Sequence, residues 1–385
     1  MNMHRKVSQL KHLIIFIITL TLIFPSCKKT YWKPGTPLAK ENLKIGVVHI
    51  TDPFSEKSGY SYTHELGIQE MKKRLNLNDS QILYKTHIDD GNPMNIDSAM
   101  RKLIDQGANI IFATSWGYMD TCEKLSVEFP SVIFSHATGI KHNNTNFTNY
   151  FGRVYQARYL SGICAGAQTK TGKIGYVAAM GKDNSEVTGG INAFALGVEK
   201  VNPKARIYVK VTYNWFDPMG ETAAAKDLIA AGCDVIAQHC DTSIPQIEAE
   251  KAGVWGIGYN SDMSADAPNA VLTSVLWHWG VYYTYLVESV INGTFTTTPW
   301  FGSLKDGVID ISPLNKNITW KAETLRILED ERDRIKSYTF DVFSGVMETN
   351  DGRRIGKVGE NLSDDEIRGG INWYYRNVII ESNKP

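Results

Sequence analysis

Residues 173–212, KIGYVAAMGKDNSEVTGGINAFALGVEKVNPKARIYVKVT, carry the pattern that decides the fold. A β-rich apolar run at 173–178 precedes a stretch of helical spacing at 184–201, which ends at Asn202 and Pro203, and a second β-rich run follows at 206–212. A strand, a helix and a strand in this order predict a βαβ unit, whose two strands lie parallel in one sheet.

The same alternation extends in both directions along the chain. We expect further strands at 43–50, 81–87, 109–114, 132–137, 234–238, 254–259 and 270–275, and further helices at 62–75, 94–106, 119–129, 155–169, 219–231 and 244–252. Two such sets lie on either side of residues 150–153. The predicted fold class is therefore α/β, with two doubly wound Rossmann-like lobes and a ligand cleft between them.

The last part of the chain departs from this rhythm. Residues 320–338 have a charged helical pattern, 340–358 resemble a hairpin or loop, and 362–380 start with a Ser363 cap and continue as an aromatic-rich helix. We assign 43–152 plus 277–385 to the N-terminal lobe and 153–276 to the C-terminal lobe, and we expect the C-terminal segments to wrap the N-terminal lobe.

The first residues predict export. Arg5, Lys6 and Lys11 precede the uncharged run 13–24, which fits the core of a signal peptide and is short for a membrane span. The run ends in Phe24-Pro25-Ser26-Cys27, which is similar to a bacterial lipobox, so residues 1–27 are expected to be a lipoprotein signal peptide and Cys27 the lipidated residue. An ordinary secretory signal is the alternative. Residues 28–42 are polar and predict a tether between lipid and domain.

Composition excludes several classes of function. Lys plus Arg and Asp plus Glu both number 41, so the net charge is zero and predicts no binding to nucleic acid. Cys122, Cys164, Cys233 and Cys240 lack CxxC spacing and are interpreted as buried thiols. We expect no cofactor, no metal and a monomer.

Polar and aromatic residues follow nearly every predicted strand. The candidate ligand-binding residues are Tyr60, Ser61, Trp116, Asp120, Trp215, Asp241, Asn260, Asp262 and Trp277. Rings on opposing lobes can sandwich a planar ligand, and carboxylates accept hydrogen bonds from its amino or ring N–H groups. No strand end carries a Gly-rich phosphate cradle. The pattern indicates a flat, neutral-to-basic, nitrogen-rich ligand.

Each candidate also has a purely structural interpretation. Aromatic residues make up 11% of the chain, so some of these rings serve packing. Asp217-Pro218 can cap a helix after Trp215, and Asp120 can be a first-turn helix acid. His239, Asp241 and His278 could form a metal or acid–base set, but their spacing matches no metal motif and favours polar residues at a cleft rim.

Long stretches of the chain resemble the BMP family of substrate-binding lipoproteins, which serve ABC importers of purine nucleosides and related compounds. The resemblance lies in residues 159–217, 226–258, 271–274 and 302–308. It implies the type I periplasmic-binding-protein fold, a non-catalytic role, a small-molecule purine ligand and an ABC permease as partner. The segments SGYSYTHELG (58–67), FATSWGYMD (112–120), EFPSVIFSHATG (128–139) and YNSDM (259–263) are more similar to the adenine-binding branch.

Residue by residue, the resemblance places the family's stacking aromatics at Tyr60 and Trp215 and its base-reading acid at Asp120. Ser61 stands where the family has a base-contacting Asn. Asn260 and Trp277 stand where nucleoside binders have a ribose-holding acid and a Lys, which favours a free nucleobase, adenine first, because an indole cannot replace the lost hydrogen bond. Asp262 remains available for a polar edge of the ligand.

The expected function is therefore an extracytoplasmic substrate-binding protein, lipid-anchored to a bacterial membrane in the cell envelope, that delivers a purine to an ABC importer. Two alternatives stay open. One is a purine nucleoside receptor for transport or signalling. The other is an exported nucleoside hydrolase using Asp120, Asp262 and His239 or His278, although the sequence has no nucleophile elbow, metal set or paired-carboxylate motif.

Overall fold

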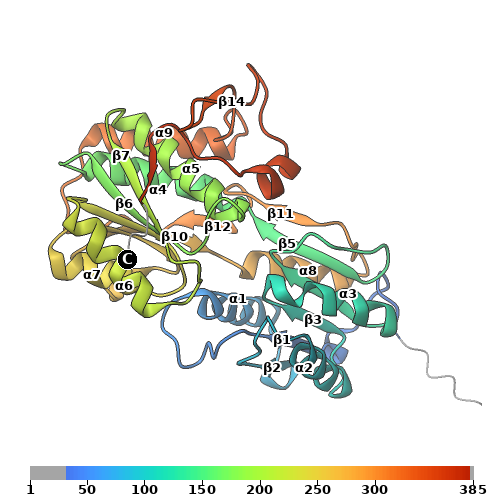
Figure 1. Ribbon diagram of the computed structural model, residues 1–385. Helices are drawn as coiled ribbons and strands as arrows, with labels where there is room; N and C mark the ends of the chain where they lie inside the picture. Colours follow the sequence, from blue (N-terminus) through green and yellow to red (C-terminus); the bar gives the residue numbers. More distant parts are fainter. Residues whose placement is uncertain (1–31, 382–385) are drawn as a thin grey trace, which may run out of the picture. The chain divides into compact units, whose positions relative to one another are not determined.

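The computed structural model describes residues 32–381, and residues from Lys33 onward form one compact unit. The predicted signal peptide and Cys27 lie outside the described residues. Within this unit the chain builds two sheets, one parallel and one parallel except for an edge strand, with helices on both faces of each (Figure 1).

The first sheet has the strand order β11-β5-β4-β3-β1-β2, and each neighbouring pair runs parallel. Its strands are β1 (Ile45–Val48), β2 (Ile82–Lys85), β3 (Ile110–Ala113), β4 (Ile133–Ala137), β5 (Phe147–Gly152) and β11 (Trp300–Gly302). The helices of this lobe are α1 (Tyr60–Leu75), α2 (Pro93–Asp105), α3 (Met119–Glu128) and α8 (Gly280–Asn292). Helix α1 packs on α8, and α2 packs on α3.

The second sheet has the order β12-β10-β9-β8-β6-β7-β15, in which β12 alone runs antiparallel to its neighbour within the described chain. Its strands are β6 (Lys173–Ala178), β7 (Arg206–Val211), β8 (Val235–His239), β9 (Trp255–Asn260), β10 (Val271–Trp277), β12 (Ile309–Ile311) and β15 (Val378–Ile380). Its helices are α4 (Val154–Gln168), α5 (Ser185–Val201), α6 (Pro218–Ala230), α7 (Ile244–Ala252) and α9 (Ala322–Lys336). Helices α4 and α5 pack together, α6 packs on α7, and α9 packs on α4.

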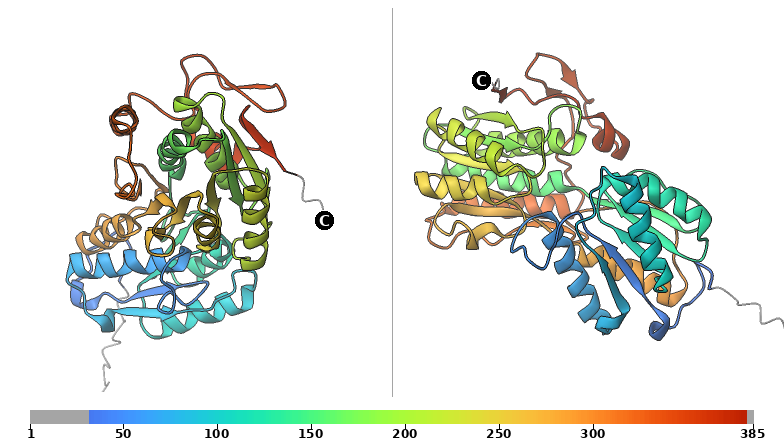
Figure 2. Two further views of the ribbon diagram at one scale, coloured as in Figure 1. Left: turned by 90° about the vertical axis from the view of Figure 1, so that its left-hand side faces the viewer. Right: turned by 60° about the horizontal axis from the view of Figure 1, so that its bottom comes forward.

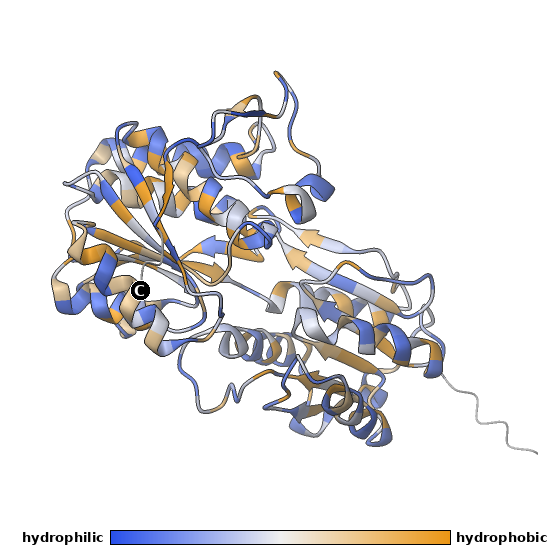
Figure 3. Cartoon of the chain, in the orientation of Figure 1, coloured by the Kyte–Doolittle hydropathy of each residue, from blue (hydrophilic) through white to orange (hydrophobic). Residues whose placement is uncertain are grey.

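Local sequence explains where these elements begin and why the strands stay inside. All residues of β1 and β3 are buried, as expected for central parallel strands that helices cover on both faces. Asn184 caps α5 by accepting the backbone N–H of Val187 at 3.0 Å, and Asp217 caps α6 in the same way, with Pro218 in the first turn. In Figure 3 several central strands are largely orange (apolar), whereas the flanking helices alternate between orange and blue. The predicted α/β class with two doubly wound lobes is confirmed.

The C-terminal segments differ from the prediction. Residues 277–385 were expected to wrap the first lobe, but they divide between the lobes: α8 and β11 join the first, whereas β12, α9 and β15 join the second. Figure 2 shows the red C-terminal chain lying along the second lobe. The reason is that the edges of the second sheet, at β10 and β7, offer backbone groups to pair with, which no local pattern reveals.

The predicted helix at 362–380 is also wrong. Only a short π-type turn, η5 (Glu366–Gly370), forms there, and the chain then runs extended into β15. Gly369 and Gly370 disfavour helix continuation, and the backbone beyond them is bound elsewhere: Asn192 of α5 donates to the Trp373 carbonyl at 2.7 Å and accepts from the Tyr375 N–H at 2.8 Å. The 340–358 region contains the expected hairpin, β13 (Met347–Glu348) with β14 (Arg354–Ile355).

The close packing of α4 on α5 depends on glycines. A Cβ added at Gly197 would lie 2.0 Å from the Tyr159 carbonyl oxygen, and one at Gly162 would lie 2.2 Å from the Phe194 carbonyl oxygen. These neighbours are backbone atoms, so a rotamer change cannot relieve the overlap. No helix in the described part of the chain is both long and apolar enough to cross a membrane.

Gly197→Ala should therefore destabilise the protein by about 1–3 kcal/mol, because the added methyl forces the two helices apart. The measurement is the free energy of unfolding from chemical denaturation. Gly369→Ala is the matched control, since a Cβ there meets no atom within 4 Å. Equal stability of both variants and the wild type would contradict the packing argument.

Candidate functional site

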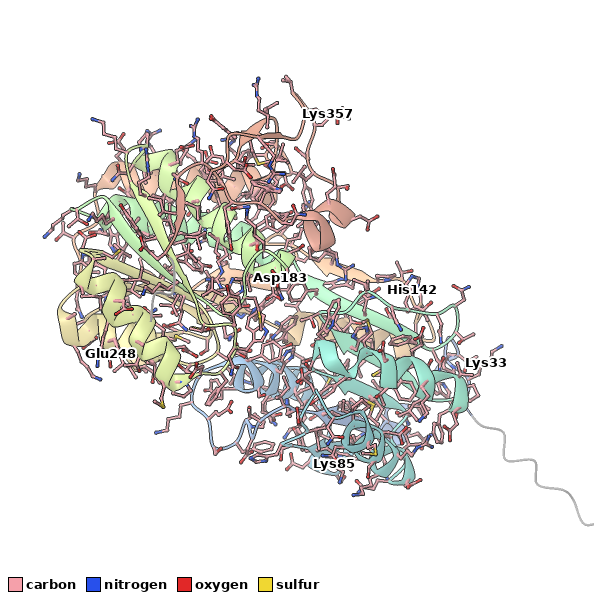
Figure 4. All side chains as sticks on the ribbon, viewed as in Figure 1. Lys33, Lys85, His142, Asp183, Glu248 and Lys357 are labelled. Atoms are coloured by element: carbon pink, nitrogen blue, oxygen red, sulfur yellow. The ribbon has the colours of Figure 1, made fainter. Side chains whose placement is uncertain are left out.

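A cavity of about 930 Å³ lies between the two lobes, and many polar residues that follow the strands line it. Its lining comes from the residues that follow β1, β3 and β4 of the first sheet and β6, β7 and β8 of the second. This is where ligands bind in open parallel sheets, because the carboxyl ends of the strands meet at one edge. Figure 4 labels Asp183, a lining residue just before α5, at the second lobe's side of the cleft.

Aromatic rings line the cavity from both lobes. Tyr60, the first residue of α1, and Trp116, in the short turn η3 (Trp116–Tyr118), come from the first lobe. Trp215 and Phe216, in the loop before α6, come from the second. Trp116 is 52% exposed, so it lies at the rim. Trp215 packs edge-on against His239, with ring centroids 5.9 Å apart, which fixes the position of its indole.

Asp241 brings a partly buried carboxylate to the cavity. It follows β8, and Asn260 at the end of β9 donates to its Oδ1 at 2.9 Å. Burial raises its pKa to about 8, with repulsion from Glu221, Glu186 and Glu56 adding to the effect and the Asn260 hydrogen bond opposing it. Asp241 is therefore a carboxyl that can hold a proton near neutral pH.

Glu186 is a second carboxyl of the same kind, in the first turn of α5. Its Oε1 accepts from the Tyr259 hydroxyl at 3.2 Å and lies 3.4 Å from Nε2 of His239. Burial raises its pKa to about 7, opposed by the Tyr259 hydrogen bond and by Arg158. Burial and Arg158 lower the pKa of His239 well below its usual value, so that ring is neutral and brings no positive charge to Glu186.

Tyr60 and Ser61 line the cavity from the first lobe. The Tyr60 hydroxyl is buried and has no hydrogen-bond partner among the described residues, although it lines the cavity. Ser61 is buried and accepts from the Thr51 N–H at 3.3 Å. Gly59, with φ of +96°, lies directly against the second lobe: a Cβ there would come within 2.7 Å of the Asp241 carbonyl oxygen. The lobes therefore meet next to the two carboxyls.

Asp120 does not belong to this lining. It lies in the first turn of α3, its side chain is 82% exposed, and it pairs with Lys141 at 2.9 Å. The structure thus places it as a solvated helix acid. A carboxylate in the first turn already has a favourable position beside the helix N-terminus, which explains the location without a ligand.

Asn260, Asp262 and Trp277 also lie outside the lining. Asp262 is exposed and caps η4 (Met263–Ala265) by accepting the Ser264 N–H. Trp277 is 4% exposed, stacks on Trp279 with centroids 4.3 Å apart and donates to the Tyr259 hydroxyl at 3.2 Å. Asn260 and Trp277 therefore support the cavity indirectly. Asn260 orients Asp241 and Trp277 orients Tyr259, and both of these residues line the cavity.

The alternative acid–base set is not assembled. His239 is buried beside Glu186, whereas His278 is exposed after β10, and among the described residues no group of three His, Cys, Asp or Glu side chains is placed to hold a metal ion. Cys122, Cys164, Cys233 and Cys240 are buried and form no disulfide with one another, in agreement with their interpretation as thiols.

Sequence reasoning missed Glu186, Tyr259 and Arg368, all of which line the cavity. Glu186 could have been found, because it occupies the first turn of a helix that follows a predicted strand end, the same position that singled out Asp120. Tyr259 is the penultimate residue of β9, next to the chosen Asn260. Arg368 gave no signal, since it comes from the C-terminal segment.

Comparisons with known proteins agree with this architecture. The family model described as "ABC transporter substrate-binding protein PnrA-like" (Bmp) matches residues 44–338. A purine-binding protein of Brucella abortus is 33% identical over 344 residues, which cover 89% of this chain and 95% of that protein. A Haloferax volcanii protein, named for glucose binding in an ABC transporter, is 31% identical over 78% of this chain and 75% of its own length.

A solved structure shares the fold at lower sequence similarity. An ABC transporter solute-binding protein from Conexibacter woesei superposes with a TM-score of 0.65 at 17% identity, covering 78% of this chain and 98% of that structure. The match over residues 44–338, with the two parallel lobes and the cavity at their strand ends, assigns the chain to a family: it belongs to the PnrA-like (Bmp) family of ABC transporter substrate-binding proteins.

Proposed function

We propose that this protein captures a purine, as the free base and with adenine preferred, in the cavity between its lobes. The observation that carries the proposal is the pairing of aromatic rings from opposite lobes with two partly buried carboxyls, Glu186 and Asp241, on the same cavity. Such a site suits a flat ligand rich in N–H donors. The purine-binding relative from Brucella supports the ligand class.

Stacking would supply much of the affinity. Tyr60 and Trp215 lie on opposite lobes, so a planar base between them gains contact area on both faces as the lobes close around it. Base-on-aromatic stacking contributes about 1–3 kcal/mol for each base. Trp116 and Phe216, at the outer part of the cavity, would shield the bound ring from water.

The carboxyls would supply specificity. An ionised carboxylate accepts hydrogen bonds from an amino group or ring N–H, and a protonated one can donate to an unprotonated ring nitrogen. Purine bases present donors and acceptors on neighbouring edges. With pKa values of about 7 and about 8, Glu186 and Asp241 can take either role near neutral pH. We therefore assign base reading to these two residues in place of Asp120.

The preference for a free base over a nucleoside rests on positions 260 and 277. Asn260 directs its amide N–H to Asp241 and Trp277 directs its indole N–H to Tyr259, and neither side chain lines the cavity where a ribose would lie. A ribose placed there would lose hydrogen bonds to water without replacement. The N9–H of a free base is, by contrast, a further donor for a carboxylate.

The remaining part of the proposal concerns transport. Closure of the lobes on the purine would present both lobes to an ABC permease, and a lipid on Cys27 would hold the exported protein at the membrane, as a monomer. The family assignment supports the permease partner. Mass spectrometry of the N-terminal peptide of the exported protein tests the anchor, because a lipidated Cys27 carries the added mass of the acyl chains.

The ligand class is tested by thermal unfolding of the chain from Lys28 onward with adenine, guanine, hypoxanthine, adenosine, inosine and glucose. A ligand that binds only the folded state stabilises it by about 2.7 kcal/mol at a hundredfold excess over its dissociation constant. We expect adenine to raise the midpoint more than adenosine. A shift with nucleosides alone would overturn the free-base argument, and a shift with glucose alone would overturn the purine assignment.

Trp215→Ala should weaken purine binding by roughly five- to 150-fold, since loss of one stacking face removes about 1–3 kcal/mol. Isothermal titration calorimetry measures the change. Trp320→Ala is the matched control, because Trp320 bonds to the Asn315 carbonyl, away from the cavity lining. An affinity of Trp215→Ala within twofold of the wild type would show that the indole does not stack on the ligand.

The raised pKa values of Asp241 and Glu186 predict a pH-dependent stability of the ligand-free protein. Between about pH 4 and about pH 8 the folded state retains protons on these carboxyls that the unfolded chain has lost. Their contribution to stability is therefore fully present below about pH 4, declines as the pH rises toward 8, and is lost above it.

The double variant Glu186→Gln/Asp241→Asn cannot ionise at these positions. Its stability should therefore not fall between pH 4 and 8 through these two groups. As the pH rises from 4 to 8, the free energy of unfolding of the double variant minus that of the wild type should increase. The increase is at most about 1.4 kcal/mol per pH unit for each group. Chemical denaturation at several pH values measures the difference, and the single variants separate the two groups. Parallel profiles for wild type and double variant would contradict the buried-carboxyl argument.

A further inference from the structure

Residues 373–380, which follow the region matched by the family model, are fixed to the second lobe. Strand β15 pairs with β7, and the preceding segment binds α5: the Tyr375 hydroxyl donates to Glu199 at 2.6 Å, and Asn377 donates to the Ala195 carbonyl at 3.1 Å. Trp373, Tyr374 and Tyr375 are buried. These contacts make the segment a firmly attached part of the second lobe.

From this anchor, residues 363–370 reach across to the first lobe (Figure 1). Nη2 of Arg368 donates to the Gly139 carbonyl at 2.7 Å and to Oδ1 of Asn149 at 3.1 Å, and the guanidinium lies 5.3 Å from the centroid of the Phe301 ring. Gly139 follows β4, Asn149 belongs to β5, and Phe301 belongs to β11. Arg368 therefore joins the second-lobe segment to β5, to β11 and to the loop after β4.

The first-lobe acceptor is rigidly placed. Thr138 has φ of +67°, and a Cβ on Gly139 would fall 1.5 Å from Cε1 of the buried His136 ring, so only glycine fits and the backbone is pressed against that ring. The segment is held on the other side by Arg153, at the junction of β5 and α4, which forms a bidentate ion pair with Asp364 at 2.6 and 2.8 Å. Both ends of the crossing are thus fixed.

The same residues face the ligand cavity. Ile367, Arg368 and Gly369 form part of its lining, next to Phe301 and Ile140 of the first lobe. Opening the cleft by separating the lobes would pull Arg368 away from Gly139 and Asn149. Burial lowers the pKa of Arg368, which shows that its guanidinium is partly removed from water in this position.

We propose that residues 363–370 form a third wall of the ligand cleft and that Arg368 is a positioning residue that latches the first lobe to this wall when the cleft is closed. The latch acts on the equilibrium between open and closed lobes. A ligand trapped in the closed form leaves only after the lobes separate, so the hydrogen bonds of Arg368 slow its release. Loss of the latch shifts the population toward the open form.

The proposal is tested first without ligand, by the distance between spin labels on Val127→Cys in α3 and Lys226→Cys in α6. Both positions are exposed, and the four native cysteines of the described chain are buried. We expect Arg368→Met to lengthen and broaden the distance distribution relative to the wild type. Arg376→Met is the matched control. Arg376 lies in the attached residues 373–380 and pairs with Glu199 and Glu348, so it makes no ion pair with the first lobe.

The second measurement is the dissociation rate of adenine by stopped-flow fluorescence, and this arm alone rests on the proposed purine function. We expect Arg368→Met to raise the rate by roughly tenfold, with little change in the association rate, and Arg376→Met to leave both unchanged. If Arg368→Met does not fold, Arg368→Lys carries the test, since it keeps the charge and the stem but loses the planar fork. An unchanged distance distribution in the Arg368 variant would overturn the latch, whatever ligand the protein binds.

Discussion

The structure depends on one geometric constraint: in each lobe the parallel strands end at the same edge, and the two edges face a common cavity. Helical crossovers bury central strands such as β1 and β3 on both faces, and the loops after the strand ends supply much of the cavity lining. Thr51, Trp116, Trp215 and Asp241 come from four such loops. The site follows from how the sheets are built, and the residues in those loops set its chemistry.

That chemistry is governed by two carboxyls that are partly removed from water and hydrogen-bonded to neutral side chains. Glu186 and Asp241 are supported by neutral donors, Tyr259 and Asn260, and these are held in turn by Trp277 and by the end of β9. Arg158 lies behind Tyr259, with Cζ 4.1 Å from the ring centroid, rather than in the cavity. A ligand with N–H groups can supply the missing donors, whereas an anionic ligand would meet repulsion.

The C-terminal segment connects this site to the equilibrium between the lobes. Its hydrogen bonds to α5 and its strand pairing with β7 hold it on the second lobe, and Arg368 bonds to the first. Gly59 makes another contact between the lobes, beside Asp241. The Arg368 hydrogen bonds and the contact between Gly59 and Asp241 would both change when a ligand binds and the lobes move. Residues far apart in the chain can therefore control how long a ligand stays bound.

The two lobes and most of their elements could be predicted from the amino-acid sequence, because the periodicity of a strand or helix and its capping residues, such as Asn184 and Asp217, lie within a few residues of one another. The sequence also placed Tyr60, Trp116, Trp215 and Asp241 at the cavity, since strand ends can be read from the local pattern. Three features depend on tertiary contacts and could not be predicted: Asp120 faces solvent, Trp277 donates a hydrogen bond to Tyr259 from outside the cavity lining, and residues 362–380 do not form a helix. The physical reason is distance along the chain: Arg368 and Gly139 are 229 residues apart, and such a contact is set by which sheet edges, helix faces and backbone acceptors are left unpaired once the lobes have folded.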